Sequence, residues 1–146
     1  LNRDLIIEAA LRLVEKGGPT ACSMRELADA LDGLRLDGLR FSPTHFIPAF
    51  SKHQGEVCGG VDIHITDPYG LRAVSLGLHL IRTLQALYPE DFAFRAPATP
   101  GGRWHIDLST GNDILRTTQR SAAEIYASWQ TDAESFQEET LLYRLY

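Results

Sequence analysis

The polar groups that a fold by itself does not explain are concentrated in one stretch, residues 41–67. It contains a polar loop, Ser51–Glu56, then the adjacent glycines Gly59 and Gly60, and then a predicted strand over residues 61–66. Apolar and polar residues alternate along that strand, which places a carboxylate, an imidazole and a hydroxyl on one face. Such groups can hydrogen-bond a polar ligand or assist a catalytic group, so we predict the functional site here.

The predicted strand has an apolar and a polar face. The residues expected to lie on the core are Val61, Ile63 and Ile65, and those on the opposite face are Asp62, His64 and Thr66. His64 offers the most direct chemistry, because an imidazole can donate a hydrogen bond to a ligand. A histidine ring held by neighbouring backbone carbonyls accounts for the residue equally well.

Two further candidates flank His64. The glycines Gly59 and Gly60 permit a bulge, or a close approach of the backbone to a ligand or to another strand. Asp67 precedes Pro68, and an aspartate at that position is also typical of a turn or a cap. Both a ligand contact and a turn role stay open for Asp67.

Composition excludes several classes of function. The chain has 146 residues, 44% of them hydrophobic and 23% charged, which predicts one soluble globular domain with a single core. A net charge of −5 disfavours a nucleic-acid surface, which needs clustered Lys and Arg. No apolar run approaches the roughly 20 residues that span a bilayer, and no signal-peptide pattern opens the chain. We therefore expect no nucleic-acid or membrane partner, and a cytoplasmic location for the chain as it stands.

We expect neither a cofactor nor a metal. Cys22 and Cys58 form no disulfide framework and no metal-ligand pair, so both are predicted to be small buried thiols. The five histidines lack the spacing of zinc ligands, and no glycine-rich loop is suited to cradle a phosphate.

The elements that must position the candidate residues predict an α+β fold, in which helices pack on a small β-sheet after two N-terminal helices. The predicted helices are residues 1–17, a short helix opened by an S-x-x-E capping box at Ser23, residues 73–87, residues 111–120, and a helix opened by a second capping box at Ser121. Further strands are expected at residues 92–94, 104–108 and 141–146.

Several motifs in order carry a resemblance to a known family. FxPxFSKxxGxxCGGVxIHxTD spans residues 46–67; GLRF precedes it, and LYPEDFAFR, GND, EIYASW and LLYRLY follow it. Residues 38–146 thereby resemble the C-terminal domain of the exo-β-N-acetylmuramidases, formerly a domain of unknown function. Those enzymes remove N-acetylmuramic acid from peptidoglycan fragments, and they are often exported.

The resemblance implies an accessory, substrate-binding domain that closes one side of a sugar pocket. Ser51 and Lys52 match its FSK motif and are implied to contact the lactyl carboxylate or the acetamido group, although a loop lysine is often merely solvated. Hydrolysis of a glycoside usually needs two carboxyl groups. The candidates by location are Glu56, Asp62, Asp67 and Asp107. The family has a larger Rossmann-like domain that is expected to supply the catalytic residues, so the catalytic residues here are unknown and we expect no catalysis by this chain alone.

The first 31 residues resemble another family, the first two helices of a TetR-type regulator's DNA-binding domain. A five-residue sequence, LDGLR, is then repeated directly over residues 31–40. This repeat suggests a fusion seam, although two Asp-Gly turns account for it too. We therefore divide the chain into a TetR-like helix pair, residues 1–32, and a muramidase-like domain, residues 33–146.

The recognition helix that a TetR-type regulator uses to read DNA is missing from this stretch. Residues 1–32 carry four basic and six acidic side chains, which further disfavours DNA binding. The alternative functions are therefore a structural or homodimerising module and, with less support, a DNA-binding regulator.

Overall fold

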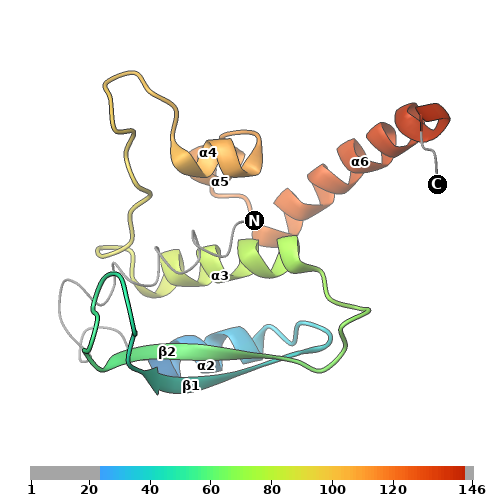
Figure 1. Cartoon of the computed structure of the whole chain (residues 1–146). Coiled ribbons are helices and arrows are strands. Elements are labelled where there is room, and N and C mark those ends of the chain that lie inside the picture. The colour runs from blue at the N-terminus through green and yellow to red at the C-terminus, as the bar shows by residue number, and fades with distance from the viewer. Residues whose placement is uncertain (1–23, 144–146) are drawn as a thin grey trace.

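A hairpin of two antiparallel strands carries the predicted site, and helices cover one of its faces (Figure 1). In this computed structural model, which describes residues 24–143, β1 (Leu39–Phe46) pairs with β2 (Cys58–Ile65). The register sets Leu39 opposite Ile65 and Phe46 opposite Cys58. The helices are α2 (Met24–Gly33), α3 (Ala73–Leu87), α4 (His105–Thr110), α5 (Ile114–Thr117), α6 (Ala122–Thr140) and the 3-10 helix η2 (Leu141–Tyr143). The predicted α+β class is confirmed.

Helix α2 packs its apolar stripe on the hairpin. Leu27, Ala28 and Leu31 recur at helical spacing and are all buried, as the sequence predicts. They belong to a first core cluster whose other buried members are Leu39, Phe41, Leu80, Leu84 and Tyr88. Helix α2 therefore belongs to the same packed unit as β1 and α3.

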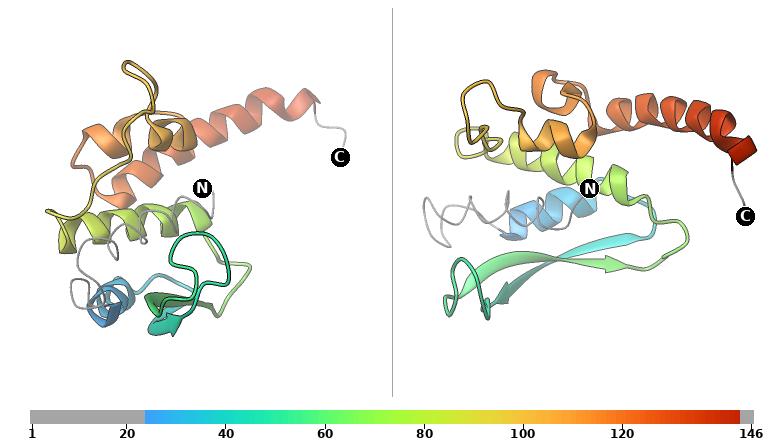
Figure 2. Two further views of the ribbon diagram at one scale, coloured as in Figure 1. Left: turned by 60° about the vertical axis from the view of Figure 1, so that its left-hand side comes forward. Right: turned by 45° about the horizontal axis from the view of Figure 1, so that its top comes forward.

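Helix α3 is the central element, as predicted, and its bounds match the prediction. Leu80 and Leu84 face the first cluster, while Leu78 and Ile81 face a second one. The other buried members of the second cluster are Ile106, Leu115, Ala122 and Ile125. The two views of Figure 2 accordingly show α3 between the hairpin with α2 on one side and α4–α6 on the other.

The predicted capping box opens α6. The Ser121 hydroxyl accepts a hydrogen bond from the Glu124 backbone N–H at 3.2 Å, and the Glu124 carboxylate accepts one from the Ser121 N–H at 2.7 Å. Hydrogen bonds from the Ser121 hydroxyl and backbone lower the pKa of Glu124. The sequence motif therefore identifies the true start of this helix.

Three predicted elements are wrong. Residues 92–94 have irregular backbone, residues 104–108 lie largely in α4 instead of a strand, and the helix expected over residues 111–120 shrinks to α5. Apolar residues at 104, 106 and 108 read as period two, but only Ile106 is buried and Leu108 is exposed. Phe92 and Phe94 pack edge to face at 5.1 Å without a partner strand.

The chain end also differs from the prediction. Leu141–Tyr143 forms η2, where a terminal strand was expected over residues 141–146; residues 144–146 lie outside the described part. The second half of α6 projects away from the body (Figures 1 and 2), and residues 131–139 are all exposed. Among residues 24–143, no helix combines the length and apolarity needed to cross a bilayer.

Strand β1 was not predicted, and the expected core face of β2 is only partly correct. Pro43 lies inside β1, which is possible because each strand of a two-stranded sheet is an edge strand. Val61 packs against the first cluster, but Ile63 is 38% and Ile65 50% exposed. Helix α2 packs mainly against β1, so it leaves this end of β2 uncovered.

Replacing Leu31 by alanine should lower the free energy of unfolding by about 2–5 kcal/mol, because this side chain of α2 is fully buried in the first core cluster, against the hairpin and α3. The matched control Leu34→Ala, at a position 43% exposed, should cost less than about 1 kcal/mol. Urea unfolding of the two variants measures the difference. Equal losses would contradict the packing of α2 as a core element.

Candidate functional site

One face of the hairpin is turned away from α2, and we call it the outer face. It is defined by Ser42, Thr44 and Phe46 of β1 and by Gly60, Asp62 and His64 of β2. The register places Ser42 opposite Asp62 and Thr44 opposite Gly60, so side chains of the two strands meet on this face. Within residues 24–143 no helix covers it, as both views of Figure 2 show.

His64 is bonded across the hairpin. Its Nε2 atom lies 2.8 Å from the hydroxyl oxygen of Ser42, its diagonal neighbour on β1. Both side chains meet on the outer face, where His64 is exposed. A serine hydroxyl thus orients the imidazole, a partner that the sequence pattern does not reveal. Finding it requires β1 and its register, which only the folded chain supplies.

The two glycines point in opposite directions. A Cβ atom on Gly59 would lie 2.9 Å from Met24 Cγ, so this glycine admits the close approach of α2. A Cβ atom on Gly60 would meet the Phe46 ring, with Cε1 at 3.0 Å, on the outer face. Packing therefore accounts for Gly59, whereas Gly60 belongs to the outer face.

Ser51 and Lys52 lie in the loop that joins the strands. Ser51 and His53 adopt positive φ angles of 71° and 58°, and Gly55 one of 81°. A left-handed backbone is unfavourable for a residue with a Cβ atom and often accompanies function. Nδ1 of His53 lies 3.1 Å from the Glu56 carboxylate, so Glu56 helps to hold the loop.

Asp67 belongs to the turn after β2. Its Oδ1 atom accepts a hydrogen bond from the Tyr69 backbone N–H at 3.0 Å, which closes an Asx turn. A Cβ atom on Gly38, whose φ is +72°, would lie 2.9 Å from the Asp67 Cβ. The turn role left open by the sequence is thus present in the structure.

The predicted site residues do not form one compact site. Gly60 and His64 share the outer face, Ser51 and Lys52 occupy the loop at one end of the hairpin, and Asp67 follows its other end. At about 3.3 Å per residue, Gly60 and Asp67 are roughly 23 Å apart along the strand. The outer face, with its bonded imidazole, is therefore the candidate site.

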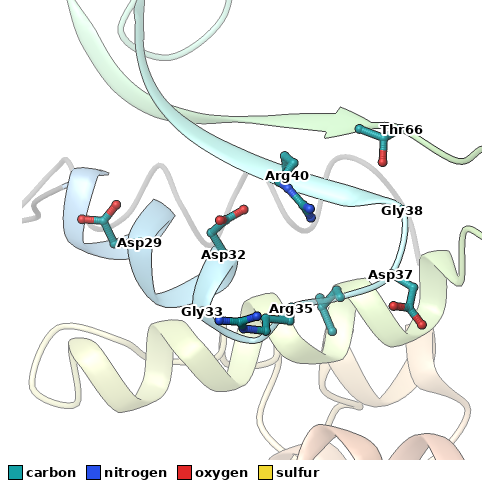
Figure 3. A pocket seen from close by; sticks show the side chains of 9 residues that line it. Asp29, Asp32, Gly33, Arg35, Asp37, Gly38, Arg40 and Thr66 are labelled. Carbon is teal, nitrogen blue, oxygen red and sulfur yellow. The ribbon is translucent and has the colours of Figure 1, made fainter.

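A polar hollow of about 680 Å³ lies beside the hairpin, between the end of α2 and the turn before β1 (Figure 3). Arg40 turns into it, and one of its guanidinium nitrogens donates to the Leu39 carbonyl at 2.7 Å. Asp32, also in its wall, accepts from the Phe41 N–H at 3.3 Å. Both side chains bind nearby backbone, so they stabilise the turn into β1.

The remaining predicted carboxyl, Asp107, lies on α4 in an ion pair. It accepts from Arg116 at 2.9 and 2.6 Å, and this contact raises the pKa of the arginine. The Arg116 guanidinium also lies 4.8 Å from the Trp104 ring centre. Trp104, Tyr126 and Trp129 pack against the second cluster, which accounts for these aromatics as core.

Comparison with known proteins identifies the family. The family described as "Exo-beta-N-acetylmuramidase NamZ, C-terminal" matches residues 15–146. The chain belongs to this NamZ C-terminal family. The resemblance proposed from its motifs is thereby confirmed for the muramidase-like part.

The chain spans less than half the length of two proteins that it matches. Peptidoglycan beta-N-acetylmuramidase NamZ of Bacillus subtilis (strain 168) is 36% identical over 124 residues, which are 83% of this chain and 28% of the relative. A crystal structure of a DUF1343 family protein from Bacteroides fragilis NCTC 9343 superposes with a TM-score of 0.71 at 26% identity. It covers 98% of this chain, which corresponds to 40% of that protein.

The NamZ family match begins before α2, so this helix and the LDGLR repeat lie inside it. The resemblance of residues 1–31 to a TetR helix pair and the division at residue 32 stay predictions. The first predicted helix and Cys22 lie outside the described residues. Cys58 is buried, as predicted.

Replacing Ser42 by alanine should change the ¹⁵N resonances of the His64 ring, because the variant removes the hydroxyl 2.8 Å from Nε2. Ser42→Thr, which keeps a hydroxyl, should retain most of the wild-type signal. The ring signals of His105, an exposed histidine on α4, provide the control in the same spectra. Unchanged His64 resonances in Ser42→Ala would contradict the bond.

Replacing Ser51 by glycine should raise the free energy of unfolding by about 1 kcal/mol, because glycine adopts φ = 71° without a Cβ penalty. The converse substitution, Gly55→Ala, at φ = 81° and with open space around the added Cβ, should lower the free energy of unfolding by a similar amount. Urea unfolding measures both changes. A destabilised Ser51→Gly variant would contradict backbone strain at this motif residue.

Proposed function

We propose that this chain is the accessory, substrate-binding domain of an exo-β-N-acetylmuramidase and that its outer face contacts an N-acetylmuramic acid-containing saccharide. The observation that carries the proposal is the Ser42–His64 pair, an oriented imidazole on an exposed face. An orienting hydrogen bond fixes the ring position, so a ligand meets the other ring nitrogen in a defined geometry. The name of the Bacillus subtilis relative supports the substrate class.

The carboxyl groups favour a binding role over catalysis by this domain alone. Glycoside hydrolysis usually needs two carboxyl groups about 5–9.5 Å apart, one on each side of the scissile bond. Asp107 is ion-paired to Arg116, and Asp67 closes a turn. Asp62 is then the carboxylate on the outer face. We propose that the catalytic acids belong to a further region, the one that corresponds to the unmatched part of the longer relatives.

In this proposal the outer face closes one side of a sugar pocket. An exposed imidazole and carboxylate beside hydroxyl groups offer several directed hydrogen bonds, which a polyhydroxylated ligand can satisfy at once. The loop with Ser51 and Lys52 lies at the end of the same hairpin. It would approach the lactyl carboxylate or the acetamido group of the sugar.

Helix α6 supports a second candidate, an interaction module that dimerises. Its projecting half and η2 expose Phe136, Leu141, Leu142 and Tyr143 at 64–91%. A projecting helix gains little stability by itself, and clustered exposed apolar groups often mark an interface. The acidic residues Asp132, Glu134, Glu138 and Glu139 on the same segment oppose close pairing of two copies.

The first test is release of the chromophore from a chromogenic β-N-acetylmuramide, together with binding of N-acetylmuramic acid by the same sample. We expect binding without turnover, and a loss of about tenfold in affinity for His64→Ala, since an oriented imidazole contact is worth about 1.4 kcal/mol. His105→Ala is the matched control and should bind normally. Turnover that disappears in His64→Ala would place catalysis in this chain and contradict the proposal.

Light scattering over a range of concentrations tests the second candidate. The binding domain should keep the mass of one chain throughout, because the acidic residues at the end of α6 would repel the same residues of a second copy. A dimeric mass that the variant Phe136→Glu abolishes, while Phe50→Glu in the hairpin loop leaves it intact, would instead establish the interaction module.

A further inference from the structure

The outer face also carries an aromatic ring in an unusual position. A Cβ atom on Gly60 would lie 3.0 Å from Cε1 and 3.4 Å from Cδ1 of Phe46, and 3.4 Å from Thr44 Cγ2. The ring therefore lies against the bare backbone of Gly60, where a larger side chain would displace it. Thr44, directly opposite Gly60 in the register, also faces this backbone.

The Phe46 ring remains accessible although it is held in place. It is 46% exposed, whereas Phe41 on the other face of the same strand is 8% exposed. Exposed aromatics elsewhere, such as Phe50 in the loop and Tyr69 in a turn, have no sheet beneath them. Phe46 is thus a supported ring with an open side.

Polar groups continue the row beyond this ring. Asp62 lies two residues after Gly60 on the same face, at about 6.6 Å along the strand. Ser42 is opposite Asp62 and is bonded to His64. An apolar ring, a carboxylate and an oriented imidazole therefore follow each other along one open strip.

From this arrangement we infer that Phe46 on Gly60 is a stacking platform for the pyranose ring of an acetamido sugar, with Asp62 accepting hydrogen bonds at the rim of that sugar. A pyranose has an apolar C–H face, which fits an aromatic ring, and polar groups around its edge. A carboxylate accepts hydrogen bonds only, so it suits the hydroxyl and acetamido N–H donors. The inference rests on the proposed function and adds the subsite.

A purely structural ring, or one that contacts a partner protein, would behave differently from a sugar platform. An aromatic side chain can cover a strand glycine merely to stabilise the sheet, and then its removal changes stability but not binding. An apolar protein surface packed on Phe46 would leave the Asp62 carboxylate and the second ring nitrogen of His64 without partners in the contact, which is unfavourable.

The experiment is a ¹H–¹⁵N NMR titration of the chain with N-acetylmuramic acid, N-acetylglucosamine and glucose. We expect the amide signals of Phe46, Gly60 and Asp62 to shift with both acetamido sugars and much less with glucose. Phe46→Ala should raise Kd by about threefold to tenfold, and Phe46→Tyr should retain binding. The matched control is Tyr69→Ala, which removes an exposed aromatic outside the strip. Stronger binding of N-acetylmuramic acid than of N-acetylglucosamine would indicate a further contact between the domain and the lactyl group.

If Phe46→Ala binds like the wild type and the shifts cluster at Ser42 and His64, the stacking subsite is wrong while the proposed function stands. If Phe46→Ala lowers only the urea midpoint, the ring is structural. If none of the three sugars shifts any signal at millimolar concentration, both the subsite and the binding function of the isolated domain are wrong.

Discussion

The packing of α2 on β1 is the contact on which the candidate site depends. A two-stranded hairpin has little stability of its own in water and needs a helix or further strands against one face. Here Leu27, Ala28 and Leu31 supply that cover, and α3 completes the cluster from the other side. The hairpin is thus supported on its inner face, and within residues 24–143 no helix covers the outer face, which we propose as the ligand-binding surface.

Gly59 and Gly60, adjacent in β2, face opposite sides of the hairpin. Gly59 admits the side chain of Met24 on the inner face, whereas Gly60 receives the Phe46 ring on the outer face. A side chain at the first position would collide with the Met24 side chain, and one at the second would displace the Phe46 ring. The paired glycines of the family motif therefore have two separate physical reasons, of which only the second bears on the proposed sugar subsite.

The open outer face fits a domain that works beside a larger partner region. The Bacillus subtilis relative is matched over 28% of its length, and the Bacteroides fragilis structure over 40%. An exposed imidazole, carboxylate and aromatic ring on a two-stranded sheet form one wall and not a closed pocket. In such an arrangement the wall supplies orientation and binding, while the groups that break the glycosidic bond would come from outside it.

The sequence by itself determined the elements whose signals are local. Apolar periodicity gave α3, a capping box gave the start of α6, alternation gave β2, and the motifs gave the family, because each depends on residues near one another in the chain. Tertiary structure decided the rest. Both copies of LDGLR have the same five residues, yet the first ends α2 and the second leads through a turn into β1, so these five residues by themselves do not determine their conformation. The bond between Ser42 and His64 likewise exists only through the register of two strands, which no local pattern encodes.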